Sequence, residues 1–522
     1  MEEKPEQKSV EIKFDFKHPE KIGLILAILI FLVMNWWVMF SSNIIFGDEA
    51  YHTHESRWIA QNLEIPKYVP LYGTDLHRLA DTKYISSHIF FASLFYVFGF
   101  SEFLVKLFVP LLTLFSSIVI YRFVKNYISQ KLAFVSIFIF HSFPTLATYS
   151  VLYYSDIFLL FFISLSIYFF HDYLKKGSVK YLILTGVFTG FAILSKMSGF
   201  ILIFLYLIWL VWKKDVKLVK GLVIISLFAT IISVPWFIRN FSFFDTPGCG
   251  FPIFPSQKCS EGPAENIQLE RTPSAVGSEA GVMRMGLLNY VDFAYSINLF
   301  LIFLMGLIYV ILKKEEIDKF VLAIFLSLFV LLIWFASDVA TYRAEDFARQ
   351  MLPAVIPLGV ISFVFVNSFY EFLTKYHKVF GIIFIIIILY ATVTTAKSKA
   401  DTMIIVKQFS PGFFEGARWI RENTEKDDMI LSLWTHQTVY TTERKSFWPQ
   451  SQYVSIFTKN DQTAVDTLKA NGFDYIFVQK WSITDGQFYQ GYPLAFINFL
   501  NSNNQSFSKP FENQDVIIYK VV

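Results

Sequence analysis

Residues 23–52 read GLILAILIFLVMNWWVMFSSNIIFGDEAYH, a long apolar run that ends in two adjacent acids. The run Gly23–Phe40 is long enough, with its flanks, to cross a hydrocarbon core that needs about 20 residues. The pair Asp48 and Glu49 follows at the membrane edge, where ionisable side chains are costly unless they are paired or functional. The stretch therefore predicts a membrane span with a candidate chemical site directly after it.

The rest of the chain has the same apolar character. Of the 522 residues, 54% are hydrophobic, 17% are charged and 60 are phenylalanine. Soluble globular proteins carry about 25% charged residues, so the composition predicts a polytopic membrane protein. The net charge of +3 does not indicate a nucleic-acid partner, because the basic residues lie in short loops between apolar runs. Residues 1–21 form a charged tail without the features of a signal peptide, so we expect the first span to be retained as an anchor.

The positions of lysine and arginine predict the topology, since short cytoplasmic loops are enriched in them. Placing the basic loops inside puts the amino terminus in the cytoplasm and the chain after about Ser398 outside the cell. The segment Tyr84–Phe100 is apolar but short, and we expect it to lie on the outer interface, because a crossing would put a basic loop outside. About eleven transmembrane helices are predicted, at 22–45, 102–122, 132–149, 155–172, 181–196, 198–212, 219–238, 291–312, 320–337, 350–370 and 379–397.

The predicted fold is an all-α polytopic membrane domain over residues 22–397, with outer loops 47–101 and 239–290, followed by an extracytoplasmic domain over 398–522. This tail reads as a small α/β domain, because apolar, β-branched or aromatic runs alternate with helical patterns. No motif in the tail points to catalysis. Strands are predicted at Met429–Trp434, Tyr475–Gln479 and Val516–Val521, and helices at Gly412–Asn423 and Asp461–Asn471.

The two cysteines, Cys249 and Cys259, lie in the second outer loop. On the non-cytoplasmic side, a disulfide between them would close a loop rich in proline and glycine. Two free thiols in a reducing environment are the alternative. We predict the disulfide, and we consider a metal site less favoured because no further cysteine or histidine accompanies the pair.

Acidic and basic residues from distant segments fall at one predicted depth on the outer face. Asp156 lies at the mouth of the fourth span, level with Asp48. Arg239 closes the seventh span, Lys196 lies near the outer end of the fifth, and Arg349 precedes the tenth. For Asp48 and Glu49 the alternative is a role as an acidic helix cap. For Lys196 the alternative is a side chain that extends to the membrane interface and has no function. The grouping favours a reaction on a lipid-linked phosphate, in which a carboxylate takes a proton and cations hold the phosphate leaving group.

The order of these motifs resembles that of the GT-C glycosyltransferases. The most similar branch is the superfamily of dolichyl-phosphate-mannose–protein mannosyltransferases (family 39-like), with the bacterial lipid A aminoarabinose transferases as relatives. The resemblance covers Ile22 to about Pro357 and extends more loosely into the outer tail. Its motifs are Gly47-Asp48-Glu49-Ala50-Tyr51-His52, Asp156 at the mouth of a span, Pro235-Trp236-Phe237-Ile238-Arg239-Asn240, Gly250-Phe251-Pro252-Ile253-Phe254-Pro255 and Arg349-Gln350-Met351-Leu352-Pro353.

The resemblance implies an inverting transfer of a sugar from a polyprenyl-phosphate or dolichyl-phosphate donor to a hydroxyl on a lipid, glycan or protein acceptor at the outer face. At the matching positions it implies Asp48 as the catalytic base, Glu49 as its companion and Asp156 as a second acidic residue of the site. Tyr51 and His52 would line the site or contact the acceptor.

The donor phosphate has several candidate ligands. The resemblance implies Arg239 and Lys83. Tyr84-Ile85 follows Lys83 where relatives carry two prolines, so His88 could serve instead, or neither residue could. His88 could also line the site or contact the acceptor. The charge and position of Arg349 and Lys196 make them further candidates.

A metal cofactor stays open. His52 and His54 could bind a divalent metal with Asp48 or Glu49, but histidines in a solvated aromatic loop more often serve as solvated or capping residues.

The competing function is a polytopic transporter or flippase of lipid-linked or small substrates. A transporter should show internal symmetry and helices interrupted near the membrane midplane. The charges instead gather on one face, so we favour the enzyme.

Overall fold

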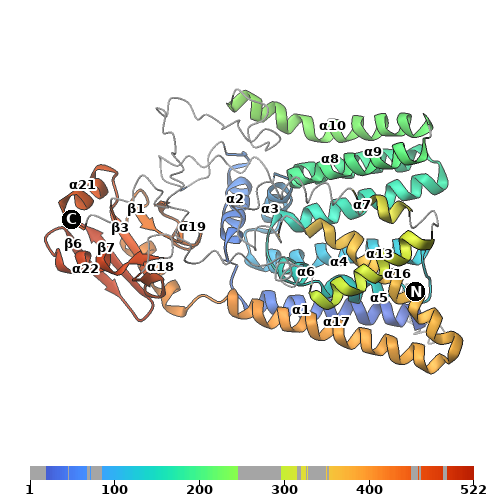
Figure 1. The fold of residues 1–522 in the computed structure, drawn as a ribbon. Helices are drawn as coiled ribbons and strands as arrows, with labels where there is room; N and C mark the ends of the chain where they lie inside the picture. The colour runs from blue at the N-terminus through green and yellow to red at the C-terminus, as the bar shows by residue number, and fades with distance from the viewer. Residues whose placement is uncertain are drawn as a thin grey trace, which may run out of the picture.

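The computed structural model consists of a helical region and a smaller C-terminal α/β region (Figure 1). Most helices of the first region run roughly parallel, whereas α2 lies across their ends, between them and the C-terminal region. The amino-terminal end of α1 lies at the opposite end of the helical region. The structure describes residues 19–44, 46–66, 71, 85–214, 216–244, 296–313, 319–324, 326, 349, 352–447, 456–457, 460–485 and 491–522.

Among the described residues, six helices are long and apolar enough to cross a membrane, and four shorter apolar helices accompany them. The predicted all-α polytopic region is therefore confirmed. Its helices are α1 (Pro19–Ser41), α2 (Asp48–Asn62), α3 (Ile85–Phe98), α4 (Glu102–Tyr127), α5 (Val135–Ser142), α6 (Pro144–Tyr149), α7 (Ser155–Lys176), α8 (Val179–Ser195), α9 (Ile201–Lys213), α10 (Val216–Phe244), α13 (Ile297–Lys313), α16 (Val355–Tyr376) and α17 (Lys378–Val406), with 3-10 turns at Met197–Phe200 and Leu352–Ala354.

The short apolar helix α3 does not carry the chain to the other end of the helical region. The ammonium of Lys106, near the start of α4, donates a hydrogen bond of 3.0 Å to the carbonyl oxygen of Ser42, which directly follows α1. The end of α1 and the start of α4 therefore lie at the same end. The described helices between them, α2 and α3, pack against each other at that end.

Glycines allow neighbouring helices to approach closely. A Cβ atom on Gly186 of α8 would lie 2.6 Å from the carbonyl oxygen of Ile225 in α10, and one on Gly190 would lie 2.9 Å from that of Ala229. This spacing of two glycines one turn apart matches the small-residue interfaces of membrane helices. Glycine is therefore required at both positions for the observed packing of α8 on α10.

The sequence misplaced some helix boundaries. The last span, predicted to end at residue 397, continues to Val406 as α17, because residues 398–406 contain no helix-breaking residue and Lys397 pairs with Asp401 one turn later at 2.6 Å. The span predicted over 132–149 is divided into α5 and α6 at Phe143, since the residue before a proline disfavours the helical conformation. The span 320–337 lies mostly outside the described residues.

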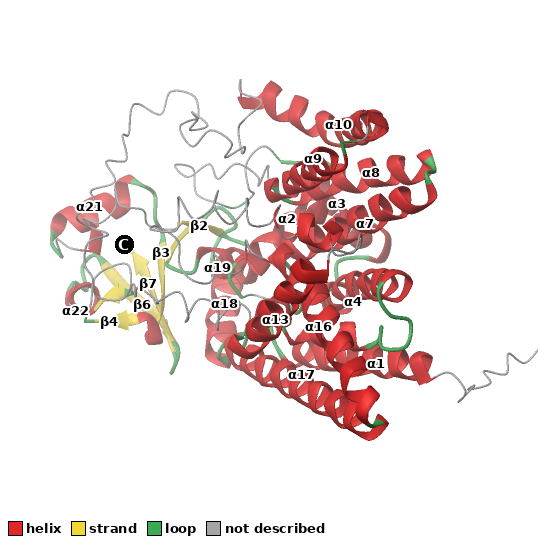
Figure 2. Cartoon of the chain, turned by 45° about the vertical axis from the view of Figure 1, so that its right-hand side comes forward, coloured by secondary structure: helices red, strands yellow, loops and turns green. Residues whose placement is uncertain are grey.

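The C-terminal region is a mixed sheet with helices packed on it (Figure 2). The strand order is β2-β1-β3-β7-β6, in which β1 pairs in parallel with β2 and β3, and β7 pairs antiparallel with β3 and β6. The predicted α/β domain is confirmed. Its elements are α18 (Pro411–Asn423), β1 (Met429–Ser432), α19 (Thr435–Thr442), β2 (Lys445–Phe447), α21 (Gln462–Ala470), β3 (Tyr475–Gln479), the two-residue pair β4 (Ile483–Thr484) and β5 (Tyr492–Pro493), α22 (Leu494–Ser502), β6 (Phe507–Glu512) and β7 (Val516–Val521).

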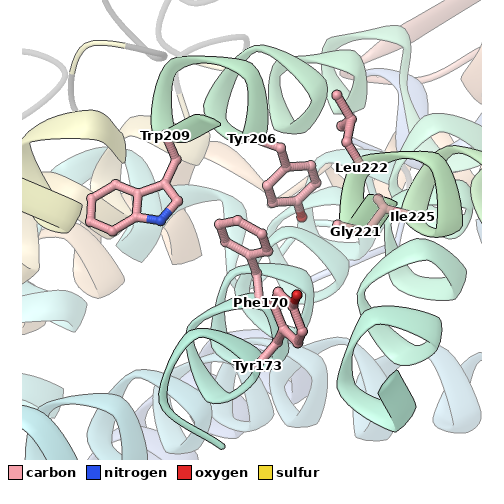
Figure 3. A pocket seen from close by; sticks show the side chains of 7 residues that line it. All are labelled: Phe170, Tyr173, Tyr206, Trp209, Gly221, Leu222 and Ile225. Carbon is pink, nitrogen blue, oxygen red and sulfur yellow. The ribbon is translucent and has the colours of Figure 1, made fainter. Parts of the chain in front are cut away.

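A small pocket lies inside the helical region, between α7, α9 and α10 (Figure 3). Phe170 on its wall is fourteen residues after Asp156 on α7, which corresponds to roughly 20 Å along a helix axis. The pocket is therefore remote from the acidic residues at the start of α7. Its lining is largely apolar and consists of Phe170, Tyr173, Tyr206, Trp209, Gly221, Leu222 and Ile225.

Candidate active site

The site begins at the first turn of α2. Gly47 precedes this helix with a φ of 51°, and a Cβ there would lie 2.6 Å from the hydroxyl oxygen of Tyr154, so glycine is needed. The backbone N–H of Asp48 donates to that hydroxyl at 3.2 Å. Both acids thus occupy the first turn, where the helix dipole favours negative charge. Their side chains leave the helix about 100° apart and meet different partners.

Arg349 joins two acids from different helices. Its Nη1 donates to Oδ2 of Asp48 at 2.7 Å, and its Nε donates to Oδ2 of Asp156 at 2.7 Å. The guanidinium also lies 4.4 Å from the ring centre of Tyr154. Lys196 donates to the other oxygen of Asp156 at 2.5 Å. Asp48, Asp156, Lys196 and Arg349 therefore form one group, which we call the Arg349 cluster.

The two acids of the Arg349 cluster differ in exposure. The side chain of Asp156 is fully buried between two cations, whereas that of Asp48 is 38% exposed. Burial alone would raise the pKa of Asp48, but the guanidinium of Arg349, together with His52 and His436, outweighs it and holds this pKa well below its usual range. Asp48 is consequently an ionised, partly accessible carboxylate, which is the state that a proton acceptor requires.

Glu49 lies in a different environment. Its side chain is fully buried and accepts hydrogen bonds from the ammonium of Lys407 at 3.0 Å and from the backbone N–H of Tyr153 at 2.9 Å. Lys407, which directly follows α17, also donates to the carbonyl oxygen of Val151 at 2.6 Å. Burial raises the pKa of Glu49, and Lys407 opposes this rise. Glu49 thus connects the first turn of α2 to the end of α17 through a buried ion pair.

The histidines of α2 and α3 form a buried group beside the cluster. A ring nitrogen of His52 lies 2.8 Å from one of His88, and the other ring nitrogen of His88 lies 3.6 Å from a carboxylate oxygen of Glu55. Burial, together with His88, lowers the pKa of His52 well below its usual value. The ring of Tyr51 packs edge-on against His52. Among the described residues, no group of three or more histidines, cysteines or acids could hold a metal ion.

The candidate phosphate ligands do not all lie together. Arg239 donates to the carbonyl oxygens of Ile65 and Pro66 at 3.0 and 3.1 Å and packs over the ring of Trp236. The structure therefore places it against the chain that follows α2, whereas Lys196 and Arg349 lie in the Arg349 cluster. Lys83, Cys249 and Cys259 lie outside the described residues.

The C-terminal region contributes residues that the sequence did not indicate. Nε2 of His436, in the first turn of α19, lies 4.0 Å from Oδ1 of Asp48. The side-chain amide of Gln437 donates to the carbonyl oxygen of Gly47 at 3.4 Å. Neither contact could be read from the sequence, because the run THQTVYTT of α19 has no distinctive pattern and follows Asp48 by almost 390 residues.

Comparisons with known proteins agree with the predicted fold. Residues 87–238 match the family model of the dolichyl-phosphate-mannose-protein mannosyltransferases. A comparison with curated protein sequences gave no match. Among solved structures, ArnT from Cupriavidus metallidurans in the apo state matches over 97% of this chain and 98% of its own, with a TM-score of 0.66 at 10% identity.

Two ligand-bound structures have the same fold. ArnT from Cupriavidus metallidurans bound to undecaprenyl phosphate matches over 95% of this chain and 98% of its own, with a TM-score of 0.66 at 12% identity. The archaeal oligosaccharyltransferase AglB from Archaeoglobus fulgidus, in complex with an inhibitory peptide and a dolichol-phosphate, matches over 90% and 70%, with a TM-score of 0.64 at 12% identity. The chain therefore has the fold of the GT-C glycosyltransferases, and its residues 87–238 match the dolichyl-phosphate-mannose-protein mannosyltransferase family, as the order of its motifs predicted.

Proposed function

We propose that this protein is an integral-membrane glycosyltransferase that moves a sugar from a polyprenyl-phosphate donor to a hydroxyl of an acceptor, with inversion at the anomeric carbon. The observation that carries the proposal is the Arg349 cluster, which combines an accessible carboxylate with two cations in a chain of GT-C fold. The ArnT and AglB structures that bind undecaprenyl phosphate and dolichol-phosphate support this class of donor.

In the proposed reaction, Asp48 acts as the general base. The oxygen of the acceptor hydroxyl attacks the anomeric carbon, and its proton passes to the carboxylate of Asp48. The bond between the anomeric carbon and the phosphate oxygen breaks, and the polyprenyl phosphate leaves with the electron pair. Attack from the side opposite the phosphate inverts the anomeric carbon.

Arg349 and Lys196 would hold the donor phosphate. Both cations are fixed by the buried Asp156, so their position does not depend on substrate. A phosphate that shares the guanidinium of Arg349 would weaken its hold on Asp48. The pKa of Asp48 would then rise, because burial opposes ionisation and less cationic charge compensates for it. Donor binding would thus make Asp48 a stronger base when the base is needed.

The proposed site faces the outside of the cell. It lies at the end of the helical region that the C-terminal region covers, opposite the start of α1 (Figure 1). The basic loops of the sequence favour a cytoplasmic amino terminus, which would leave this end extracytoplasmic. A lipid, a glycan or a secreted protein could supply the acceptor hydroxyl there.

The direct test is release of polyprenyl phosphate. The full chain, purified into nanodiscs, is incubated with labelled polyprenyl-phosphate hexoses or pentoses and with a threonine peptide, methyl α-mannoside or lipid A as the acceptor. We expect one donor to yield a labelled acceptor and one equivalent of polyprenyl phosphate. Vesicles that contain the protein and move an intact lipid-linked substrate between leaflets, without any release of polyprenyl phosphate, would instead support the flippase.

A further inference from the structure

Helix α19 brings a histidine of the C-terminal region to Asp48. The side chain of His436 is 8% exposed, and its ring packs edge-on against Tyr51 with centres 5.5 Å apart. Its Nε2 atom faces Oδ1 of Asp48 at 4.0 Å, whereas Oδ2 of the same carboxylate binds Arg349. The oxygen of Asp48 that faces His436 is thus the one that Arg349 does not hold.

Contacts along α19 and just beyond it fix the position of His436. Near the start of the helix, Gln437 donates to the carbonyl oxygen of Gly47. Farther along, the hydroxyl of Tyr440 donates to Glu102 at 2.5 Å. At its end, Glu443 accepts a hydrogen bond from Arg57 of α2 at 2.8 Å. These contacts connect α19 to α2 and to the start of α4, so His436 is held by a docked helix.

The separation of 4.0 Å has a chemical consequence. Two atoms at this distance can both lie about 2.8 Å from a single oxygen placed between them, with an angle of roughly 90° at that oxygen. A hydroxyl group can use this geometry, because it donates one hydrogen bond and accepts others. An oxygen there would donate to Asp48 and accept from His436.

We propose that His436 positions the acceptor hydroxyl for the sugar transfer proposed above. The N–H of its Nε2 donates to a lone pair of the acceptor oxygen, while the hydroxyl proton points at Oδ1 of Asp48. During attack this proton moves to Asp48, and His436 keeps its own proton throughout. The C-terminal region therefore supplies half of the acceptor site, and the membrane helices supply the base and the phosphate ligands.

The test separates acceptor use from donor use. With the acceptor probe that the wild-type protein uses, His436→Ala should raise the acceptor KM about tenfold, the effect of one lost hydrogen bond. Its donor KM and its affinity for undecaprenyl phosphate should stay within about twofold of wild type. His436→Gln keeps an N–H donor at a similar reach and should recover most of the loss. An unchanged acceptor KM, or an equal change in donor KM, would overturn the proposal.

Thr441→Ala is the matched control on the same helix, because the hydroxyl of Thr441 bonds only to carbonyl oxygens of α19 among the contacts described. It should leave both KM values unchanged.

A second experiment does not depend on activity. In a Cys249→Ser, Cys259→Ser background, the pair Asp48→Cys and His436→Cys should be joined rapidly by a short bis-methanethiosulfonate, which forms a disulfide with each thiol and releases two sulfinates, unlike Asp48→Cys with Thr441→Cys. Failure of this cross-link overturns the role of His436, whereas an inactive wild-type protein overturns the proposed function.

Discussion

Asp48 and Glu49 are adjacent in the sequence, yet their surroundings differ in every respect that matters for chemistry. Asp48 is partly exposed and shares Arg349 with Asp156. Glu49 is fully buried and binds Lys407, at the junction between the last membrane helix and the C-terminal region. A partly exposed ion pair such as Asp48–Arg349 can exchange one partner for a substrate. A fully buried pair such as Glu49–Lys407 cannot, because the exchange would leave an uncompensated buried charge.

The comparison teaches that the two acids have separate tasks. In the proposed mechanism Asp48 is the acid that reacts, because one of its oxygens is held by Arg349 and the other faces His436. Glu49 is arranged to hold the first turn of α2 in place, so that Asp48 points correctly. Glu49 is then a positioning residue. Substitution of Asp48 should mainly lower turnover, whereas loss of the Glu49–Lys407 pair should mainly lower stability.

The largest expected effect is that of Asp48→Asn on turnover. Loss of the general base should lower kcat about 1000-fold. The melting temperature should change little, because a partly exposed ion pair contributes only about 0–1 kcal/mol. Polyprenyl phosphate release and thermal unfolding of the same preparation check both statements. Asp401→Asn, an exposed acid on α17, is the control. Normal turnover by Asp48→Asn would remove the distinction between the two acids.

The second effect concerns the Glu49–Lys407 pair. Lys407→Met alone should lower the free energy of unfolding by about 3 kcal/mol, since it leaves the carboxylate of Glu49 buried without its cation. The double variant Glu49→Gln, Lys407→Met should recover most of this loss, because neither charge is then buried. Equilibrium unfolding in detergent measures both variants. A double variant with less stability than either single variant would argue against a purely electrostatic pair.

A third effect is a pH shift in Arg349→Gln. Without the guanidinium, burial dominates, and the pKa of Asp48 rises. The base must be deprotonated, so the acidic limb of the kcat/KM profile should move to higher pH than in the wild type. Stability depends on pH in the corresponding way. The pKa of the Asp48 carboxyl is lowered in the folded wild-type protein, so ionised Asp48 stabilises the fold above its unfolded pKa. This contribution is lost as the pH falls through the folded pKa. An acidic limb at the same pH in both proteins would show that Arg349 does not control the base.

The smallest expected effect is that of Arg239→Ala. This arginine holds the carbonyl oxygens of Ile65 and Pro66, outside the Arg349 cluster. Two hydrogen bonds from a charged group are lost, and we expect a roughly tenfold decrease in kcat/KM for the donor, with a smaller change for the acceptor. Arg239→Lys, which keeps the charge, should lose less. Equal losses for donor and acceptor would indicate that the residue serves only the fold.

The membrane helices could be predicted because hydrophobic runs and basic loops are local signals. The members of the Arg349 cluster could also be nominated, since ionisable residues at the ends of apolar spans stand out. Their pairing could not be predicted. Nothing in the sequence indicates that Arg349 contacts both Asp48 and Asp156, or that Lys196 binds Asp156.

The contacts that His436 and Lys407 make with α2 could not be predicted from the sequence either, because they too join distant segments. Strands β3 and β7 were predicted with their observed bounds, because they are buried apolar runs. Strand β6, with the sequence FSKPFE, is mostly exposed and contains a proline, so its pattern gives little signal. His436 and Lys407 act through contacts across the chain, and neither lies in a motif. Long-range docking of α19 and α17 against α2 decides their roles.

The Glu49–Lys407 pair also has a consequence for how the protein is made. Its two members are 358 residues apart, so during synthesis the first turn of α2 emerges long before its cation exists. The same holds for Arg349, which completes the Arg349 cluster. A nascent chain that ends before α17 would carry a glutamate without its partner, which favours hydration of that site over packing. The proposed active site can therefore be completed only after Arg349 and Lys407 have been synthesised, and chains truncated before α17 should be inactive and open to quality-control proteases.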